Sequence, residues 1–153
     1  MKQEKSKISV LMSVYKKENP EYLRASLESI LVQTRTADEI LLIEDGPLTQ
    51  ELYQVVAEYQ KKCDYLHVHA MEQNVQLGRA LAKGVELCQY DLIARMDTDD
   101  IAMPHRLEKE GAYMEAHPEV DVVGGAIREF NDEGTIDRVK NMPKRSEEHT
   151  SEL

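Results

Sequence analysis

Two short runs of this sequence are apolar almost without interruption. They are Lys7–Val14 (KISVLMSV) and Glu39–Glu44 (EILLIE). A strand with one face in water alternates apolar and polar side chains, whereas a continuous apolar run is typical of a parallel strand that is covered on both faces. We therefore expect an α/β fold, in which helices cover both faces of a mostly parallel sheet.

Segments of helical periodicity alternate with these runs. Asn19-Pro20-Glu21 is a favourable helix start, because Asn caps a helix, Pro fits its first turn and an acid suits its N-terminal end. We expect this helix to stop near Gln33. Further helices are expected near 48–62, 77–88 and 104–117, and further strands at 65–71, 90–94 and 120–127. Residues 129–139 are expected to form a hairpin or an extended loop. This strict alternation predicts one sheet, in about one domain for a chain of 153 residues.

The apolar residues also predict which sides of the later helices are buried. The third helix carries its apolar pattern on Leu77, Leu81, Val85 and Cys88, and the fourth turns Leu107, Gly111 and Met114 inward. The third strand, 65–71, alternates apolar and polar residues, so we expect it nearer an edge of the sheet. Its two histidines, His67 and His69, share one face, which we interpret as the exposed face rather than as a metal site.

Three carboxylates directly follow the expected strand 90–94. In Arg95–Asp100 (RMDTDD), the acids are Asp97, Asp99 and Asp100. Burying so much like charge without a partner is very unfavourable, so the cluster is expected at the exposed end of the strand. Carboxylate oxygens suit Mg²⁺ or Mn²⁺, and phosphates can complete the coordination of either ion. The cluster is a candidate divalent-metal site, and the alternative is a solvated acidic loop.

Polar residues end two other expected strands. They are Ser13-Val14-Tyr15 and Glu44-Asp45-Gly46, and they join Asp97-Thr98-Asp99. Parallel strands present their carboxyl ends at one edge of the sheet, where ligands bind in such folds. We therefore expect these three segments to converge on one crevice, and this convergence favours the metal site over the solvated loop.

The crevice offers groups for a nucleotide and its phosphates. A cation on Asp99 could bridge two phosphates and neutralise the charge that builds on a leaving diphosphate. Asp45 is expected to be free to accept hydrogen bonds from a base or ribose, and Tyr15 to stack on a flat ring.

Several classes of protein are disfavoured by the sequence. It has no G-x-x-x-x-G-K-[ST] loop, no G-x-G-x-x-G after the first strand and no G-x-S-x-G, which argues against P-loop, dinucleotide-binding and α/β-hydrolase proteins. A net charge of −10 argues against nucleic acid as a general partner. We find no signal peptide and no run long enough for a transmembrane segment. Cys63 and Cys88 lack metal-type spacing, and a reducing cytoplasmic location fits them.

Four segments together resemble family 2 glycosyltransferases, which have the GT-A (Rossmann-like) fold. They are KISVLMSVYKKENPEYLRASLESILVQT, EILLIEDGP, NVQLGRALAKGV and RMDTDDIAMPHRL. Each motif alone is weak, but jointly they are specific, and the resemblance runs from about Ile8 to about Val139. It implies an enzyme that transfers a sugar from a nucleotide sugar, a UDP sugar being expected, to a saccharide or glycolipid acceptor.

The resemblance also implies roles for particular residues. The uridine would be held by Ser13, Tyr15 and Asp45, and the donor diphosphate by Asp97 and Asp99 through Mg²⁺ or Mn²⁺, with Asp99 the more direct ligand. Arg79 would approach the diphosphate, or else be an exposed helix residue. We count the neighbouring residues Val14, Glu44 and Thr98 with the nucleotide-sugar site. Asp100 would shape the loop or contact the sugar.

The sequence departs from the family pattern in two places. Gln76 stands where the family often has Gly, and Ala82 where a later Asn is usual. The family inverts the sugar's configuration by means of a carboxylate base. Asp132, Glu133 and Asp137 match no base motif, so we leave the base unassigned and expect it beyond this chain. The expected object is the N-terminal donor-binding part of a truncated enzyme, with a sheet incomplete on its C-terminal side, located in the cytoplasm or at the inner face of the membrane.

The last nine residues, 145–153 (RSEEHTSEL), have no apolar period. They read like the translated start of a DNA-sequencing adapter, so we expect the GT-A domain to occupy 1–144 and the tail to be an artefact. A disordered polar C-terminus is the alternative. An uninterrupted natural reading frame across codon 145 would refute the artefact.

Two other functions remain as alternatives. Haloacid-dehalogenase-like phosphotransferases also place D-x-D after a strand, with Asp97 then the nucleophile and Asp99 the acid and base. That motif normally follows the first strand and needs a lysine and a second acid pair downstream, which do not fit here. The other alternative is a non-catalytic nucleotide-binding or interaction module, in which the D-x-D is only structural.

Overall fold

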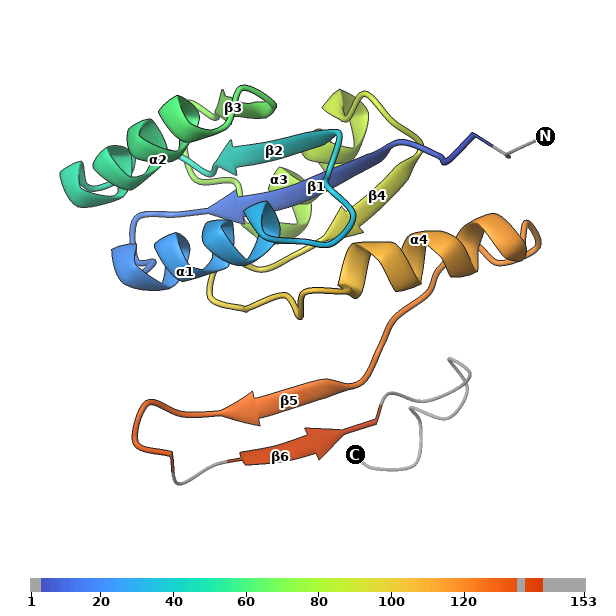
Figure 1. Cartoon of the computed structure of the whole chain (residues 1–153). Helices are drawn as coiled ribbons and strands as arrows, with labels where there is room; N and C mark the ends of the chain where they lie inside the picture. The colour runs from blue at the N-terminus through green and yellow to red at the C-terminus, as the bar shows by residue number, and fades with distance from the viewer. Residues whose placement is uncertain (1–3, 135–136, 142–153) are drawn as a thin grey trace.

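The computed structural model describes residues 4–134 and 137–141. Its centre is a four-stranded sheet in the order β3-β2-β1-β4, in which all neighbouring strands are parallel (Figure 1). The strands are β1 (Ile8–Val14), β2 (Glu39–Glu44), β3 (Leu66–Ala70) and β4 (Leu92–Arg95). The two continuous apolar runs form the two inner strands, and the alternating run forms an edge strand, as predicted.

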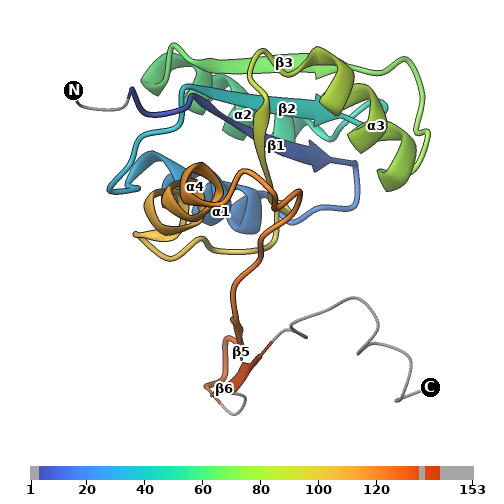
Figure 2. The same cartoon turned by 90° about the vertical axis from the view of Figure 1, so that its right-hand side faces the viewer.

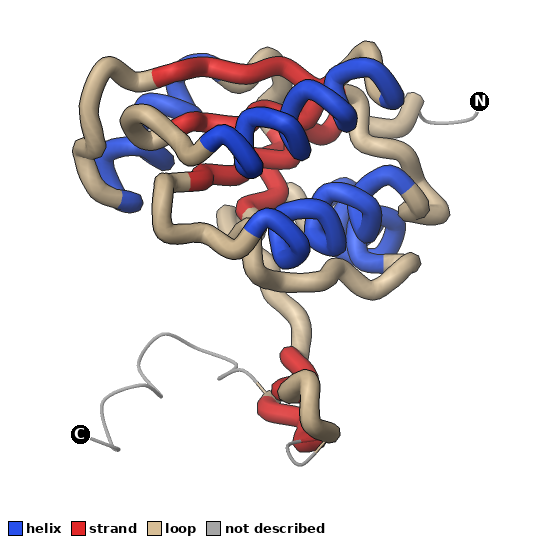
Figure 3. The backbone as a smooth tube through the Cα atoms, turned by 90° about the vertical axis from the view of Figure 1, so that its left-hand side faces the viewer, coloured by secondary structure: helices blue, strands red, loops and turns tan. Residues whose placement is uncertain are grey.

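Helices cover both faces of this sheet, which confirms the predicted fold class. They are α1 (Pro20–Leu31), α2 (Gln50–Lys62), α3 (Leu77–Leu87) and α4 (Arg106–Ala116). Alternate side chains of β1 pack on opposite faces of the sheet. Met12 belongs to the larger core, which includes residues of α1, α2 and α4, whereas Leu11 packs with Ala80 of α3. Figure 3 shows the strands enclosed between the two helix layers. In the described part of the chain, no helix has the length and apolar character needed to cross a bilayer.

Helix starts follow their capping groups. The Asn19 side chain accepts hydrogen bonds from the main-chain N–H groups of Glu21 and Tyr22, so α1 begins at Pro20 as predicted. The start of α3 at Leu77 also agrees with the prediction, whereas the starts of α2 and α4 differ from it. Thr49 caps α2, which therefore begins after Leu48. The α4 helix begins at Arg106 rather than at Pro104, and the Pro104 carbonyl accepts from the Thr34 N–H instead of entering the helix.

The buried face of α3 differs from its apolar pattern. Ala80 and Gly84 are buried, whereas the Leu77 and Val85 side chains are 48% and 55% exposed. A Cβ atom at Gly84 would lie 2.3 Å from Cδ1 of Leu11, so the helix approaches β1 too closely for a larger side chain. Small residues make the contact here. Of the four expected apolar residues, Leu81 and Cys88 do pack against the smaller core.

The strand predicted at 120–127 is wrong. Residues 120–126 form no strand, and the Val122 side chain is 85% exposed. Instead β5 (Ile127–Phe130) pairs antiparallel with β6 (Asp137–Lys140), which confirms the predicted hairpin. Two adjacent glycines interrupt the apolar run and offer no side chains to pack, which weakens it as a strand. Figures 1 and 2 show the hairpin apart from the sheet, beyond α1 and α4.

Candidate functional site

The predicted acid cluster lies just beyond the end of β4. One carboxylate oxygen each from Asp97, Asp99 and Asp100 lie within 4.8 Å of one another, and the last two side chains are exposed. Oxygen-only ligands suit a hard divalent cation, and the open side leaves room for phosphate oxygens and water. The residues therefore fit the predicted metal. Within the described ranges, neither histidine of β3 joins a comparable group of three ligands.

The charges of the cluster are only partly balanced by protein groups. Nη2 of Arg95 lies 2.7 Å from Oδ1 of Asp97, in an exposed ion pair. Although Asp100 is exposed, its pKa is raised, first by partial desolvation of its carboxyl group and then by repulsion from Asp99 and Asp97, while Arg106 and Arg95 oppose the shift. A cation among these carboxylates would relieve that repulsion.

Thr98, between the two acids of the D-x-D, points into the protein. Its side chain is 3% exposed, and Oγ1 donates to Oε2 of Glu18 at 2.6 Å and lies 3.4 Å from the carbonyl oxygen of Ser13. The hydroxyl thus links the loop that carries the three acids, Asp97–Asp100, to the segment that follows β1. The predicted contact between Thr98 and the donor stays a prediction.

Asp45 is not free, in contrast to our expectation. It is 4% exposed, its Oδ1 accepts from the Val75 N–H at 2.7 Å, and its Oδ2 accepts from Nδ2 of Asn74 at 3.2 Å. Gly46 permits this close packing, because it has φ +85° and an added Cβ would lie 2.6 Å from the Asn74 nitrogen. The sequence could not reveal these partners, which follow about 30 residues later. A role of Asp45 in binding a base stays a prediction.

Glu44 contrasts with its neighbour Asp45. The side chain is 7% exposed, and no hydrogen bond to its carboxylate is found within the described residues. Burial raises its pKa. Among the residues that the structure describes, Glu44 is thus a largely buried carboxylate at the carboxyl edge of the sheet that accepts no hydrogen bond from the protein.

The other predicted donor contacts share that edge but differ in exposure. Val14 pairs with Glu44 in the sheet register, its side chain is fully buried, and its carbonyl accepts from the Asp45 N–H at 2.8 Å. Ser13 is half-buried, Tyr15 is 44% exposed, and Arg79 is exposed in the first turn of α3. The structure therefore gathers these residues at one edge, while their contacts with a donor stay predictions.

Gln76, the first departure from the family pattern, has φ +72° and ψ 156°. This region of backbone conformation is nearly restricted to glycine, and a side chain there is strained. The geometry explains why glycine is common at this place. The second departure, Ala82, is an exposed residue of α3.

Two of the three acids considered as candidate bases, Asp132 and Asp137, have structural partners. Asp137 forms an ion pair with Arg128, with 2.7 Å between Nη2 and Oδ2, and Asp132 accepts from the Tyr22 hydroxyl at 3.2 Å. Glu133 lies in the turn between the strands. None of the three is in the metal-ligand group, and the catalytic base stays unassigned.

Sequence reasoning missed three buried polar residues. They are Ser26, Ser29 and Gln33, on or just after α1. Their spacing of three and four residues could have placed them on one helix face, but their position beside Leu27 and Ile30 drew attention to the core instead. All three bond to the main chain of the segment between β4 and the first turn of α4.

A cavity of about 330 Å³ lies at the opposite, amino edge of the sheet. Its lining includes Lys7, Tyr90 and Asp91, with the Lys7 ammonium 5.3 Å from the centre of the Tyr90 ring. None of the predicted site residues lines it, so we take the convergent carboxylates, rather than this hollow, as the candidate site.

Comparison with known proteins shows that the sequence is similar to glycosyltransferases. The profile of glycosyl transferase family 2 matches residues 9–152. A glycosyltransferase of Haemophilus influenzae is 47% identical over 143 residues, with 93% of this chain and 53% of that protein covered. The amylovoran biosynthesis glycosyltransferase AmsE of Erwinia amylovora is 46% identical, with 88% and 50% covered. The UDP-Gal:α-D-GlcNAc-diphosphoundecaprenol β-1,3-galactosyltransferase of Escherichia coli is 34% identical, with 95% and 53% covered. The chain thus spans about half the length of these relatives.

Solved structures share the fold. S. aureus TarS 1–349 in complex with UDP-GlcNAc aligns with a TM-score of 0.65 and 23% identity, covering 73% of this chain and 32% of that one. The mannosyltransferase PcManGT of Pyrobaculum calidifontis, in complex with GDP-Man and Mn²⁺, also has a TM-score of 0.65, with 14% identity and 82% and 36% coverage. At these identities the likeness shows the GT-A fold alone.

Proposed function

The chain belongs to glycosyl transferase family 2, and from this premise we propose that it is the donor-binding part of an enzyme that transfers a sugar from a UDP sugar to a saccharide or glycolipid acceptor. The observation that carries the proposal is the convergence of three carboxylates within 4.8 Å at the edge where β1, β2 and β4 end. That edge is where open α/β sheets bind their ligands.

Asp97 and Asp99 would hold Mn²⁺ or Mg²⁺ in this proposal. The ion, when bound, would neutralise the charge that develops on the leaving diphosphate. The Mn²⁺ in the PcManGT complex supports a divalent ion. Arg95, which now pairs with Asp97, would have to share that carboxylate with the ion or release it.

The nucleotide would lie between the ends of β1 and β2. Tyr15 is exposed enough to stack on a base, and Ser13 and Arg79 are accessible at the same edge. We assign Asp45 first to holding the 74–75 segment beside the nucleotide, because both its oxygens already have partners there. The UDP-GlcNAc complex of TarS and the UDP-Gal in the name of the E. coli relative support a uridine nucleotide.

The reaction itself needs a group that we do not assign in this chain. A carboxylate base would take the proton of an acceptor hydroxyl while its oxygen bonds to the anomeric carbon and the bond to the diphosphate breaks, which inverts the configuration. We propose that residues 1–153 bind the donor without transferring the sugar. The lipid-linked sugar named for the E. coli relative supports a glycolipid acceptor, and with it a cytoplasmic location at the inner face of the membrane.

Calorimetry with UDP and Mn²⁺ tests the proposal. We expect the 153-residue chain to bind UDP in the presence of Mn²⁺, and Asp99→Ala to lose most of that binding. Asp91→Ala, which removes an exposed acid at the opposite edge, is the matched control and should bind like the wild type. Absence of UDP binding by the wild type, or equal binding by Asp99→Ala, would contradict the metal-bridged site. Detectable sugar transfer by this chain would contradict the donor-binding-only assignment.

The phosphotransferase alternative is not favoured. The D-x-D follows the fourth strand, and the family profile covers nearly the whole chain. The non-catalytic module stays open to test, since it predicts that removal of divalent metal changes neither stability nor nucleotide binding.

A further inference from the structure

One face of α1 continues beyond the helix as a row of buried polar side chains. Ser26 is fully buried, and Ser29 and Gln33 are 7% and 6% exposed. Buried polar groups destabilise a fold unless they find hydrogen-bond partners. We call these three residues the polar seam, and all of their partners outside α1 lie between Asp97 and Leu107.

The serines of the polar seam bond on both sides of the acid cluster. Oγ of Ser26 donates to the carbonyl oxygen of Asp97 at 3.2 Å. Oγ of Ser29 accepts from the Ala102 N–H at 3.0 Å and donates to the Ser26 carbonyl at 2.7 Å. The main chain is therefore fixed just before and just after Asp99.

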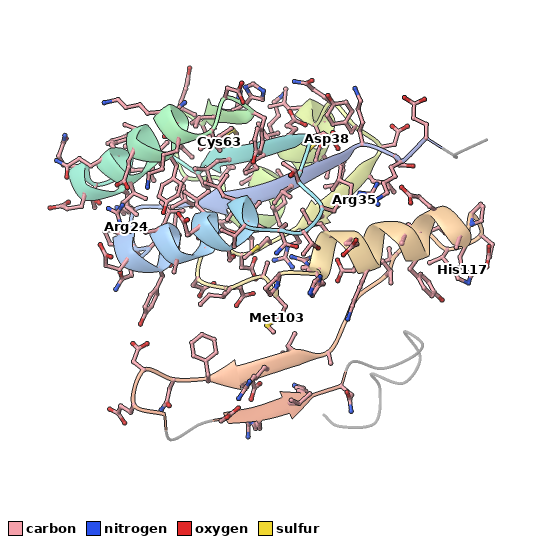
Figure 4. All side chains as sticks on the ribbon, in the orientation of Figure 1. Arg24, Arg35, Asp38, Cys63, Met103 and His117 are labelled. Carbon is pink, nitrogen blue, oxygen red and sulfur yellow. The ribbon has the colours of Figure 1, made fainter. Side chains whose placement is uncertain are left out.

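Gln33 uses both ends of its amide. Its Nε2 donates to the carbonyl oxygen of Met103 at 2.7 Å, and its Oε1 accepts from the Leu107 N–H at 3.0 Å. Leu107 lies in the first turn of α4, where N–H groups lack partners within the helix, and His105 provides no side-chain cap. Gln33 supplies that cap from the loop just after α1. In Figure 4 the Met103 side chain points away from α1, so the contact is with its main chain.

The segment from Met96 to His105 contains no helix or strand, yet it holds three like charges together. Mutual repulsion among its carboxylates favours a looser arrangement, which the main-chain bonds to α1 oppose. We propose that the polar seam, and Gln33 above all, consists of positioning residues that preset the D-x-D loop for a divalent ion and its diphosphate. This inference rests on the metal role proposed above.

A comparable polar cluster at the opposite edge gives a matched control. Oγ of Ser9 donates to Oε2 of Glu39 at 2.5 Å and accepts from the Tyr90 N–H at 3.3 Å, and Ser9 is fully buried. Ser9→Ala leaves the Tyr90 N–H without its acceptor and Glu39 with one donor fewer. Gln33→Leu likewise leaves the Leu107 N–H without its acceptor and the Met103 carbonyl with one donor fewer. Both should lower stability, but only Gln33 bonds to the metal loop.

The test measures Mn²⁺ affinity of the 153-residue chain in the presence of UDP, from the electron paramagnetic resonance signal of free Mn²⁺. We expect Gln33→Leu to weaken Mn²⁺ binding about tenfold, as loss of one to two hydrogen bonds implies. Ser26→Ala, which loses only the bond to Asp97, should weaken it about threefold. Ser9→Ala should leave the Mn²⁺ affinity of the folded protein unchanged while its melting temperature falls.

The outcomes separate this inference from the proposed function. If the wild type binds Mn²⁺ with UDP and both seam variants bind equally well, the positioning role is overturned and the metal site stands. If the wild type binds neither, both proposals are overturned. Should Gln33→Leu fail to fold, Ser26→Ala decides, since it removes a single hydrogen bond and no apolar contact.

Discussion

Carboxylates at the two edges of the sheet differ in burial and in the hydrogen bonds that the protein gives them. At the amino edge, Glu39 is 2% exposed and its Oε2 accepts from the Ser9 hydroxyl at 2.5 Å and from the Gln89 N–H at 2.8 Å. At the carboxyl edge, Asp99 and Asp100 are exposed and crowded together with Asp97. The first carboxylate is satisfied by the fold itself. The second group lacks enough protein partners, which is the condition expected of groups that serve a ligand.

The largest contrast between the edges should appear in ligand binding. We expect Asp97→Ala combined with Asp99→Ala to weaken Mn²⁺-dependent UDP binding more than about a hundredfold, which corresponds to about 3 kcal/mol. Stability should not fall, because like charges that repel one another are removed and the Arg95–Asp97 ion pair that is lost is exposed to solvent. Calorimetry and a urea titration measure the two quantities. Loss of folding in the double variant would show that the acids are structural and break the contrast.

Removing the carboxylate at the amino edge should lower stability and leave ligand binding unchanged. Glu39→Ala leaves the Ser9 hydroxyl and the Gln89 N–H without their acceptor, so we expect a loss of about 2–3 kcal/mol of unfolding free energy. UDP and Mn²⁺ binding by the folded protein should not change. Urea denaturation followed by circular dichroism checks the first expectation, and an altered nucleotide affinity would mean that the edges are coupled.

The sequence revealed the parallel sheet because a buried strand leaves a local signal. Lys7–Val14 and Glu39–Glu44 are apolar throughout, and they became the inner strands. The apolar run 120–127 gives a similar signal, but an apolar run becomes a strand only where a neighbouring strand pairs with it. Here only Ile127, the last residue of the run, is paired, and its partner strand is β6. In α3, the close approach of Gly84 to Leu11 determines which face of the helix is buried. The spacing of apolar residues in the sequence does not reveal that contact.

The position of the acid cluster was predictable from the sequence, but the partners of the buried polar residues around it were not. Acids after a strand indicate an exposed cluster at the sheet edge, and Asp97 to Asp100 lie there. The partners of Asp45 and Gln33 could not be predicted, because each bonds to a segment far along the chain. A glutamine at the end of a helix, in particular, is typical of the surface, whereas Gln33 is buried.

A smaller effect is expected at Gln76, which borders the carboxyl edge. Its φ of +72° strains a side chain but not glycine. We expect Gln76→Gly to raise the unfolding free energy by up to about 1 kcal/mol, since relief of strain is partly offset by the flexibility of glycine in the unfolded chain. Gly78→Ala on the same helix, where an added Cβ meets no atom within 4 Å, is a control for general helix effects. A less stable Gln76→Gly would contradict the strain.

The smallest expected effect concerns Glu44. Burial raises its pKa in the folded protein, so the unfolded chain loses this proton first as pH rises. Stability should therefore fall as pH rises from the ordinary glutamate pKa of about 4.3 through the raised value. Glu44→Gln removes this dependence, and we expect it to be more stable than the wild type at pH 7 but equal to it below about pH 4. Equal stability at both pH values would show that Glu44 is effectively solvated.

The central claim is that metal and nucleotide share one site at the carboxyl edge. A divalent cation and a diphosphate that contact each other in one site attract, so we expect each to raise the other's affinity, and linkage makes the factor the same for both. The direct test is the UDP affinity of the 153-residue chain with and without Mn²⁺, repeated for Asp99→Ala. We predict that Mn²⁺ tightens UDP binding at least about tenfold in the wild type, about 1.4 kcal/mol of coupling, and has no effect in Asp99→Ala. A UDP affinity that does not respond to Mn²⁺ in the wild type would contradict the account.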